Sequence, residues 1–341
     1  MCQLTGKSGK YVNSHIIPKA LTRPKEVGAP FVQGGEGLRP VRRWSSWTDT
    51  GLVIRKGEDI LEALDTWAIP VLRTHHLVWS GWGDADSFPA NQTIIDSEKR
   101  GYRIIEGIDP RKLRLFLLSL LWRAAASKIS EMSRVTLPEA DLRYLSSLLI
   151  SGDPGPIAFY PAQIIQLSTR GPVHNHTPIE QHKTIPSFVE GISETEIPIF
   201  RFYFDGLIIH FHRHANDDGY TKSLGNLVAG ASSNLSVTMI PYNISFQREV
   251  LGRIVNEAET KFGDIMDRLA WPPEQRSHSY TFLVMLCHLG FLGVPAGSRV
   301  ACSEQHGVNG KAWLCSGKSH RPRERVSGFK NRSRPGPMQR V

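Results

Sequence analysis

A chain of 341 residues that is 40% hydrophobic and 21% charged has the composition of a soluble globular protein, and its length predicts about two domains. The longest apolar runs, 115–122 and 282–286, are too short to span a bilayer, so we expect a cytoplasmic protein without a membrane partner. The cysteines are too few and too scattered for a disulfide scaffold, which agrees with a reducing compartment: Cys2, Cys287, Cys302 and Cys315.

The formal net charge of +9 is unevenly distributed. Residues 1–60 carry +5 and residues 317–341 carry +7, which leaves −3 for the chain between them. Basic ends on a neutral-to-acidic body favour contact with a polyanion such as nucleic acid, because Lys and Arg release counterions from phosphates. The alternative for the C-terminal end is a solvated, disordered tail.

The first part of the chain combines turn signals with one amphipathic helix. Glycines near residues 6 and 9 predict a hairpin in residues 1–24, with residues 10–17 as the returning strand. The Gly- and Pro-rich residues 25–50 predict a long ordered loop. A helix is expected over 57–69, where the apolar residues fall on one face, and Pro70 is expected to end it.

Helix signals are clearer in the second part of the chain. Asp109 as N-cap and Pro110 at the first helical position open a strongly apolar helix. A second helix is expected over 138–150, with Gly152 just beyond its end. Two further helices are expected at about 245–269 and 280–292.

Two β-rich segments, 199–204 and 207–212, flank Asp205-Gly206, which is a typical two-residue hairpin turn. Helices and an antiparallel hairpin together predict an α+β fold. We divide it into a module at 1–75, an α+β domain of unknown function at 76–315, and a disordered basic tail at 316–341, where few apolar residues remain to offset the entropy of ordering.

The most informative motif is VNSHIIPK at residues 12–19. It resembles the first half of an HNH (ββα-metal) nuclease module, in which a strand ends in a polar residue and a histidine, followed by an apolar pair and proline. The resemblance implies that His15 is the general base that activates water against a phosphodiester. Neutral imidazole suits this role because it titrates near working pH.

The N-terminus is similar, more specifically, to bacterial HNH-like proteins with C-x-x-C, then SHIIPK, then C-x-x-C-E at the opening of a helix. The resemblance implies four cysteines that hold a structural zinc. Here Cys2 is retained and Thr5, Ile54 and Gly57 stand at the other three positions, while Glu58 keeps its place. A structural zinc site needs four ligands, so we expect no zinc and a module held by packing.

The same resemblance implies a divalent cation, Mg²⁺ or Mn²⁺, near His15. Glu58, with Asp59 and Ser14, is expected to hold it, because carboxylates are good hard ligands. Catalysis is nevertheless open to question. Ser14 stands where active members commonly offer Asp, Gly51 is near the position of their Asn, and Glu58 replaces their last His.

An aromatic-basic stretch lies between the motif and the helix. Arg42, Arg43 and Lys56 are expected to contact phosphates, and Trp44 and Trp47 to stack on bases. The alternative is that this Trp pair packs the loop onto its own domain.

Two other sets of side chains could bind metal. His210, His212 and His214 alternate along one strand, with further histidines at 174, 176 and 182, and such pairs can converge on a transition metal. A polar surface strand gives the same pattern. Cys302, His306 and Cys315 form a looser set whose spacing matches no zinc module.

The sequence therefore favours an HNH-like nuclease, or a nuclease-derived protein, that acts on nucleic acid by metal-assisted phosphodiester hydrolysis. The alternative is a catalytically inactive HNH-derived module that binds nucleic acid or another protein. Whether the chain is an enzyme, whether it acts on DNA or RNA, and its oligomeric state are left open by the residues.

Overall fold

The computed structural model describes residues 1–23, 31–35, 38–185, 195–213 and 218–254, together with residues 256 and 260. These residues belong to one compact unit, Met1–Phe291. Helices and strands are both present, which confirms the α+β class. The segments expected to form the helix at 280–292, the basic tail and the set Cys302, His306 and Cys315 lie outside the described residues.

Four helices and twelve strands are bounded in the described part of the chain. The helices are α1 Arg55–Thr74, α2 Pro110–Ala126, α3 Glu139–Ser151 and α4 Asp218–Leu224. Residues 246–254 are also helical. The strands are β1 Ser14–His15, β2 Phe31–Gly35, β3 Leu38–Arg43, β4 Thr48–Asp49, β5 Thr93–Ile94, β6 Gly101–Ile105, β7 Ala162–Leu167, β8 His174–His176, β9 Ile179–Ile185, β10 Thr195–Phe204, β11 Leu207–His212 and β12 Leu235–Ile240.

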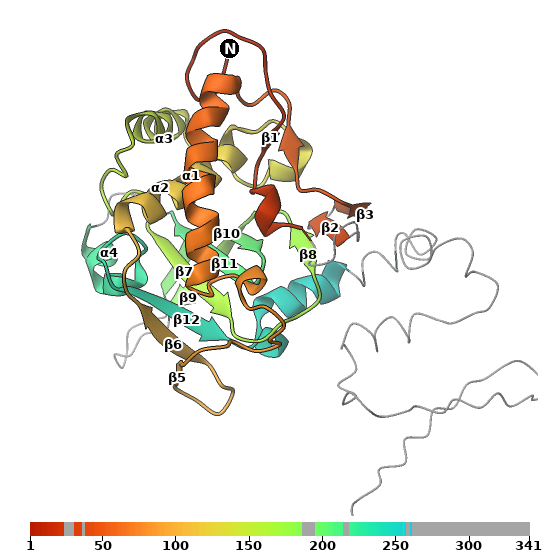
Figure 1. Ribbon diagram of the computed structural model, residues 1–341, viewed down its shortest axis with the longest axis vertical. Coiled ribbons are helices and arrows are strands. Elements are labelled where there is room, and N and C mark those ends of the chain that lie inside the picture. The colour runs from red at the N-terminus through yellow and green to blue at the C-terminus, as the bar shows by residue number, and fades with distance from the viewer. Residues whose placement is uncertain are drawn as a thin grey trace, which may run out of the picture. The chain divides into compact units, whose positions relative to one another are not determined.

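The strands form three sheets (Figure 1). The largest has seven strands in the order β5-β6-β12-β7-β11-β10-β9, in which β12 and β7 are parallel and the other neighbours are antiparallel. A three-stranded sheet has the order β3-β2-β8, and β1 pairs with β4. The N-terminal strands thus lie in small sheets of their own, beside the main sheet.

Helix α2 lies in the middle of the core. Every residue from 113 to 124 is buried, including the charged side chains of Arg114 and Arg123. One hydrophobic cluster runs from Cys2 to Tyr242 and contains residues on both sides of position 75, where a domain boundary was expected. In the part of the chain that the structure describes, none of the helices has the length and apolar character needed to cross a membrane.

Local signals placed α2 and α3 correctly. The carboxylate of Asp109 accepts hydrogen bonds from the backbone N–H groups of Arg111 and Lys112, at 3.0 and 3.1 Å, as an N-cap should. Helix α3 ends at Gly152, whose φ of 70° is the left-handed conformation that favours glycine. These two predictions are confirmed because each depends on residues within one helix.

The predicted hairpin is also confirmed. Strands β10 and β11 pair antiparallel from Ile199 with His212 to Phe204 with Leu207. Asp205 and Gly206 have φ values of 49° and 77°, and positive φ at both central residues matches the twist of the flanking strands. The helix expected from residue 245 is present over residues 246–254, and its expected end lies outside the described residues.

The expected end of the first helix was wrong. Pro70 lies inside α1, which continues to Thr74. The proline faces solvent, so the backbone carbonyl one turn earlier, at Thr66, can be hydrated in place of its missing helical bond. The apolar face of α1, with Leu61, Ala68 and Leu72 buried, therefore continues past Pro70.

Two expectations for residues 1–50 were also wrong. The strand expected over 10–17 is reduced to Ser14–His15, because its partner β4 is only two residues long. The segment expected to be a loop contains β2 and β3, and β2 pairs parallel with β8. That partner is about 140 residues away in the sequence, so its contribution is not visible in the local composition.

Candidate functional site

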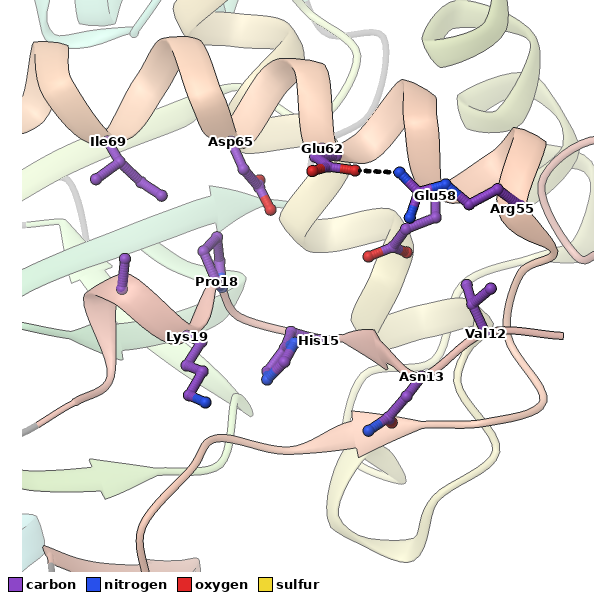
Figure 2. A pocket seen from close by; sticks show the side chains of 11 residues that line it. Val12, Asn13, His15, Pro18, Lys19, Arg55, Glu58, Glu62, Asp65 and Ile69 are labelled. Carbon is purple, nitrogen blue, oxygen red and sulfur yellow. Dashed lines mark hydrogen bonds and ion pairs between the residues drawn. The ribbon is translucent and has the colours of Figure 1, made fainter. Parts of the chain in front are cut away.

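Residues 12–20, which include His15 of β1, and helix α1 line a cavity of about 290 Å³ (Figure 2). In the β1–β4 pair, Ser14 lies opposite Asp49 and His15 opposite Thr48. The polar and charged side chains that line the cavity come from the motif and from one side of the helix: Asn13, His15, Lys19, Arg55, Glu58, Glu62 and Asp65.

Helix periodicity explains why three carboxylates line one cavity. Glu58, Glu62 and Asp65 are spaced by four and three residues and so share one face of α1. The side of α1 next to these acids packs into the core through Leu61 and Leu72, which are at most 1% exposed. The amphipathic pattern thus fixes the rotation of α1 and turns its acids toward the motif.

His15 is the titratable group of the motif. Burial is the largest effect on its pKa and lowers it, and the charges of Lys19 and Arg123 lower it further against the opposing effect of Asp65. The ring Nε2 lies 3.3 Å from the Ser45 hydroxyl oxygen. At neutral pH the imidazole is therefore uncharged and can accept a proton.

Two of the three carboxylates are held by arginines. Glu62 is 2.7 Å from the Arg55 guanidinium, in a pair that is more than half exposed. Asp65 is 2.7 Å from Arg123, whose side chain is 1% exposed. Both pairs reduce the negative charge that the cavity offers to a cation.

Glu58 is different. Its Oε2 atom is buried and has no hydrogen-bond partner among the described residues. In Figure 2 its carboxylate points from α1 toward the segment that carries His15 and Pro18. A buried carboxylate oxygen without a donor is costly unless a cation or water satisfies it, so Glu58 fits a metal ligand.

The described residues contain no group of three or more His, Cys, Asp or Glu that could hold a metal ion. This does not remove the fit at Glu58, because Mg²⁺ keeps several waters and is commonly bound through one or two carboxylates together with phosphate oxygens of the substrate. A transition-metal site built entirely from protein ligands would need a group of three or more such side chains.

Two expected metal ligands do not join the cavity. Ser14 is 1% exposed and points to the other side of β1 from His15, toward the interior. Asp59 is exposed and its carboxylate is 2.7 Å from Arg55. Of the expected set, only Glu58 lines the cavity with His15. The structure adds Lys19, Glu62 and Asp65, and the helical spacing from Glu58 was the signal for the two acids.

The expected nucleic-acid contacts lie outside this cavity. Arg43, Trp44 and Lys56 are exposed, and the side chain of Arg42 lies outside what the structure describes. Trp47 is only 4% exposed and belongs to the core cluster, so its ring cannot stack on a base. For Trp47 the expectation of base stacking was wrong, and its packing role explains its position.

The positions of the four-cysteine pattern lie close together. The N–H of Thr5 donates to Cys2 Sγ at 3.4 Å. A Cβ atom on Gly57 would lie 2.9 Å from the same sulfur. Cys2 is a free, buried cysteine in the same cluster as Ile54. These four residues therefore pack against one another at the positions where the resemblance implies metal ligands.

The histidines of the hairpin are interior groups. His210 and His212 are both buried in β11. His210 Nε2 accepts from Arg201 Nε at 3.0 Å, and His212 Nδ1 bonds to the Tyr220 hydroxyl. His174 and His176 bond to backbone carbonyls, His182 is exposed, and His214 is not described. Strand β11 is buried along its whole length, so the alternative of a polar surface strand was also wrong.

Comparisons with known proteins give no match to a family model, to a curated protein or to a solved structure. The resemblance of residues 1–75 to HNH modules therefore stays a hypothesis from the motif. The cavity shared by His15 and Glu58 is the physical basis for assigning a function.

Proposed function

We propose that this protein hydrolyses phosphodiesters in nucleic acid with the help of Mg²⁺ or Mn²⁺, with His15 as general base and Glu58 as metal ligand. The observation that carries the proposal is the cavity that both residues line. The imidazole of His15 is partly desolvated and uncharged. The carboxylate of Glu58 has one oxygen without a hydrogen-bond partner among the described residues. Phosphodiester hydrolysis needs both an activated water and a cation against developing charge.

The protein's own groups supply the proton transfer. In the tautomer whose Nε2–H donates to the Ser45 hydroxyl, Nδ1 is the basic nitrogen. It accepts the proton of the attacking water, and the ring becomes positively charged. Lys19 in the lining of the cavity attracts the phosphate. The cation, when bound, supplies Lewis-acid stabilisation of the negative charge on the phosphoryl oxygens.

Two further observations support the proposal. The antiparallel pair β1–β4 followed by α1 has the ββα order that the resemblance implies. The four positions of the cysteine pattern fall in one place around Cys2, although three of them carry other residues. Both are features of the backbone arrangement, and neither depends on the identity of a catalytic side chain.

A second candidate is a catalytically inactive module that binds nucleic acid or a protein. It is favoured by the ion pairs of Glu62 with Arg55 and of Asp65 with Arg123. Within the described residues, these pairs leave Glu58 as the one carboxylate of the cavity without an arginine. An arrangement of this kind holds a helix in place without needing a cation.

Cleavage of a supercoiled plasmid and of a labelled single-stranded oligonucleotide, with Mg²⁺ or Mn²⁺, separates the candidates. The variants are His15→Ala and Glu58→Ala, and the matched control is Asp59→Ala, which removes an exposed carboxylate from the same turn of α1. The proposal expects metal-dependent nicking that both cavity variants lose and the control keeps. Absence of cleavage, with nucleic-acid binding equal in all four proteins, would establish the inactive module.

A further inference from the structure

One face of the seven-stranded sheet carries two cations that have no carboxylate partner within the described residues. Lys183 in β9 lies opposite Ile197, and Arg201 in β10 lies opposite Ile179, so both side chains project from the same face. Both are half-buried. Among the ion pairs within 4.0 Å in the described residues, neither side chain takes part.

Two neutral side chains on the adjacent strands complete this face. Arg201 lies opposite His210 in β11, which lies opposite Gln163 in β7. Arg201 Nε donates to His210 Nε2 at 3.0 Å, and Lys183 Nζ donates to Gln163 Oε1 at 2.6 Å. We call these four residues the cationic face; its strands are seen in Figure 1.

His210 holds its proton on the far nitrogen. Because Nε2 accepts from Arg201, an uncharged ring carries its hydrogen on Nδ1. The Nδ1 atom is buried and has no partner in the described part of the chain, and the residue is 4% exposed. Among the residues described, the cationic face thus contains a donor without an acceptor, as well as two cations without an anion.

The charges on and beside the cationic face are mainly positive. Burial lowers the pKa of Arg201 to about 10, and only exposed Glu249 opposes this effect. Burial also lowers the pKa of Lys183, and the charge of Arg201 lowers it further. Arg201 also lies over the Phe246 ring, and a further cation, Arg253, lies 5.3 Å from the centre of the same ring. Desolvated like charges are destabilising unless an anion compensates them.

We propose that the cationic face binds the phosphate group of a small molecule, with Lys183 and Arg201 as its ligands. An Arg guanidinium presents paired N–H donors that match phosphate oxygens, and Lys adds a point charge. Two cations match a dianionic phosphate monoester better than a single carboxylate. Because both side chains are only partly buried, a ligand can reach them from solvent.

Calorimetric titration of the full chain with inorganic phosphate and with AMP, at constant ionic strength in chloride, tests the proposal. We expect binding that Lys183→Gln weakens at least about tenfold, which corresponds to about 1.4 kcal/mol, and that Lys183→Arg largely keeps. Tighter binding of AMP than of phosphate would identify a nucleotide as the source of the phosphate, and equal binding would identify free phosphate.

Two controls keep the result specific. Arg213→Gln removes a cation that lies over Phe200 on the opposite face of the sheet and is paired with Glu180, so phosphate binding should persist. His15→Ala should also keep it, which separates this site from the proposed active site. Absence of binding by the wild type, or an equal loss in Lys183→Gln and Arg213→Gln, would overturn the proposal.

Discussion

Arg123 of α2 and Asp65 of α1 form a two-pronged ion pair, with 2.7 Å between Nη2 and Oδ1 and 3.0 Å between Nη1 and Oδ2. Arg123 also donates to the carbonyl of Leu61 at 3.2 Å. A guanidinium that is 1% exposed thus joins the central helix to the helix that carries Glu58. This contact fixes the position of α1, and with it Glu58 of the candidate site, relative to the core helix α2.

Replacement of Asp65 by Ala should therefore be strongly destabilising. It leaves the Arg123 guanidinium buried without a carboxylate, and breaking a buried pair in this way costs about 3–5 kcal/mol. Urea denaturation of wild type and variant measures the difference. The double variant with Arg123→Met removes the orphaned charge and should recover part of the loss, whereas a double variant no more stable than the single one would show that the orphaned charge is not the cause.

Acid should destabilise the fold through His174 and His176. Burial lowers the pKa of each ring to about 4 from 6.5. The unfolded chain binds more protons between these values, so this stability is fully present above pH 6.5 and is lost as the pH falls toward 4, by about 3 kcal/mol for each ring. Between pH 7 and pH 4, the denaturation midpoint of His174→Gln should fall less steeply with decreasing pH than that of the wild type. An equally steep fall in both proteins would be inconsistent with a buried, neutral ring.

Asp205 should have the opposite pH dependence. Burial raises its pKa to about 7 from 3.8, although bonds from Ser80 oppose the shift. Its contribution to stability is therefore present below pH 3.8 and is lost as the pH rises through about 7. Asn at this position retains an oxygen for the Ser80 N–H and tolerates positive φ. Thermal melts at pH 8 should show Asp205→Asn to be more stable than wild type, and a lower melting temperature would show that the charge is favourable.

The close packing around Cys2 predicts that a zinc site can be restored. Thr5→Cys, Ile54→Cys and Gly57→Cys together place four thiols at positions that already lie together, and four thiolates bind Zn²⁺ tetrahedrally. We expect one Zn²⁺ for each triple-variant chain by metal analysis, and none for Gly57→Ala. That control should instead lose stability, because its Cβ would lie 2.9 Å from Cys2 Sγ. A triple variant without zinc would weaken the resemblance to four-cysteine modules.

The parts of the fold that local chemistry determines could be predicted from the sequence. Asp109 caps its own helix and Asp205-Gly206 turns its own hairpin. Strand β2 could not be predicted, because it pairs with β8 from far along the chain. The extension of α1 beyond Pro70 depends on solvent exposure of the proline and on burial of Leu72, which are tertiary properties.

The candidate site divides in the same way. His15 and Glu58 were selected from the motif and from the start of the helix, and the structure places both in the lining of one cavity, although their roles remain a proposal. The pairing of Asp65 with Arg123 was missed because the partners lie 58 residues apart. Ser14 was wrongly placed with His15, since neighbouring residues in a strand face opposite sides. For Trp47 the sequence left base stacking and packing onto its own domain as alternatives, and its burial agrees with packing.

Chemical rescue tests whether His15 removes a proton from the attacking water. Metal-dependent plasmid nicking is measured for wild type and for His15→Ala, with and without added imidazole, across pH 5 to 9. Because the pKa of His15 is lowered, wild-type cleavage should rise with pH and level off below neutrality. We expect His15→Ala to be inactive and imidazole to restore its cleavage. Nicking by His15→Ala at the wild-type rate, or a wild type that does not nick DNA with either metal, would contradict the proposed role of His15.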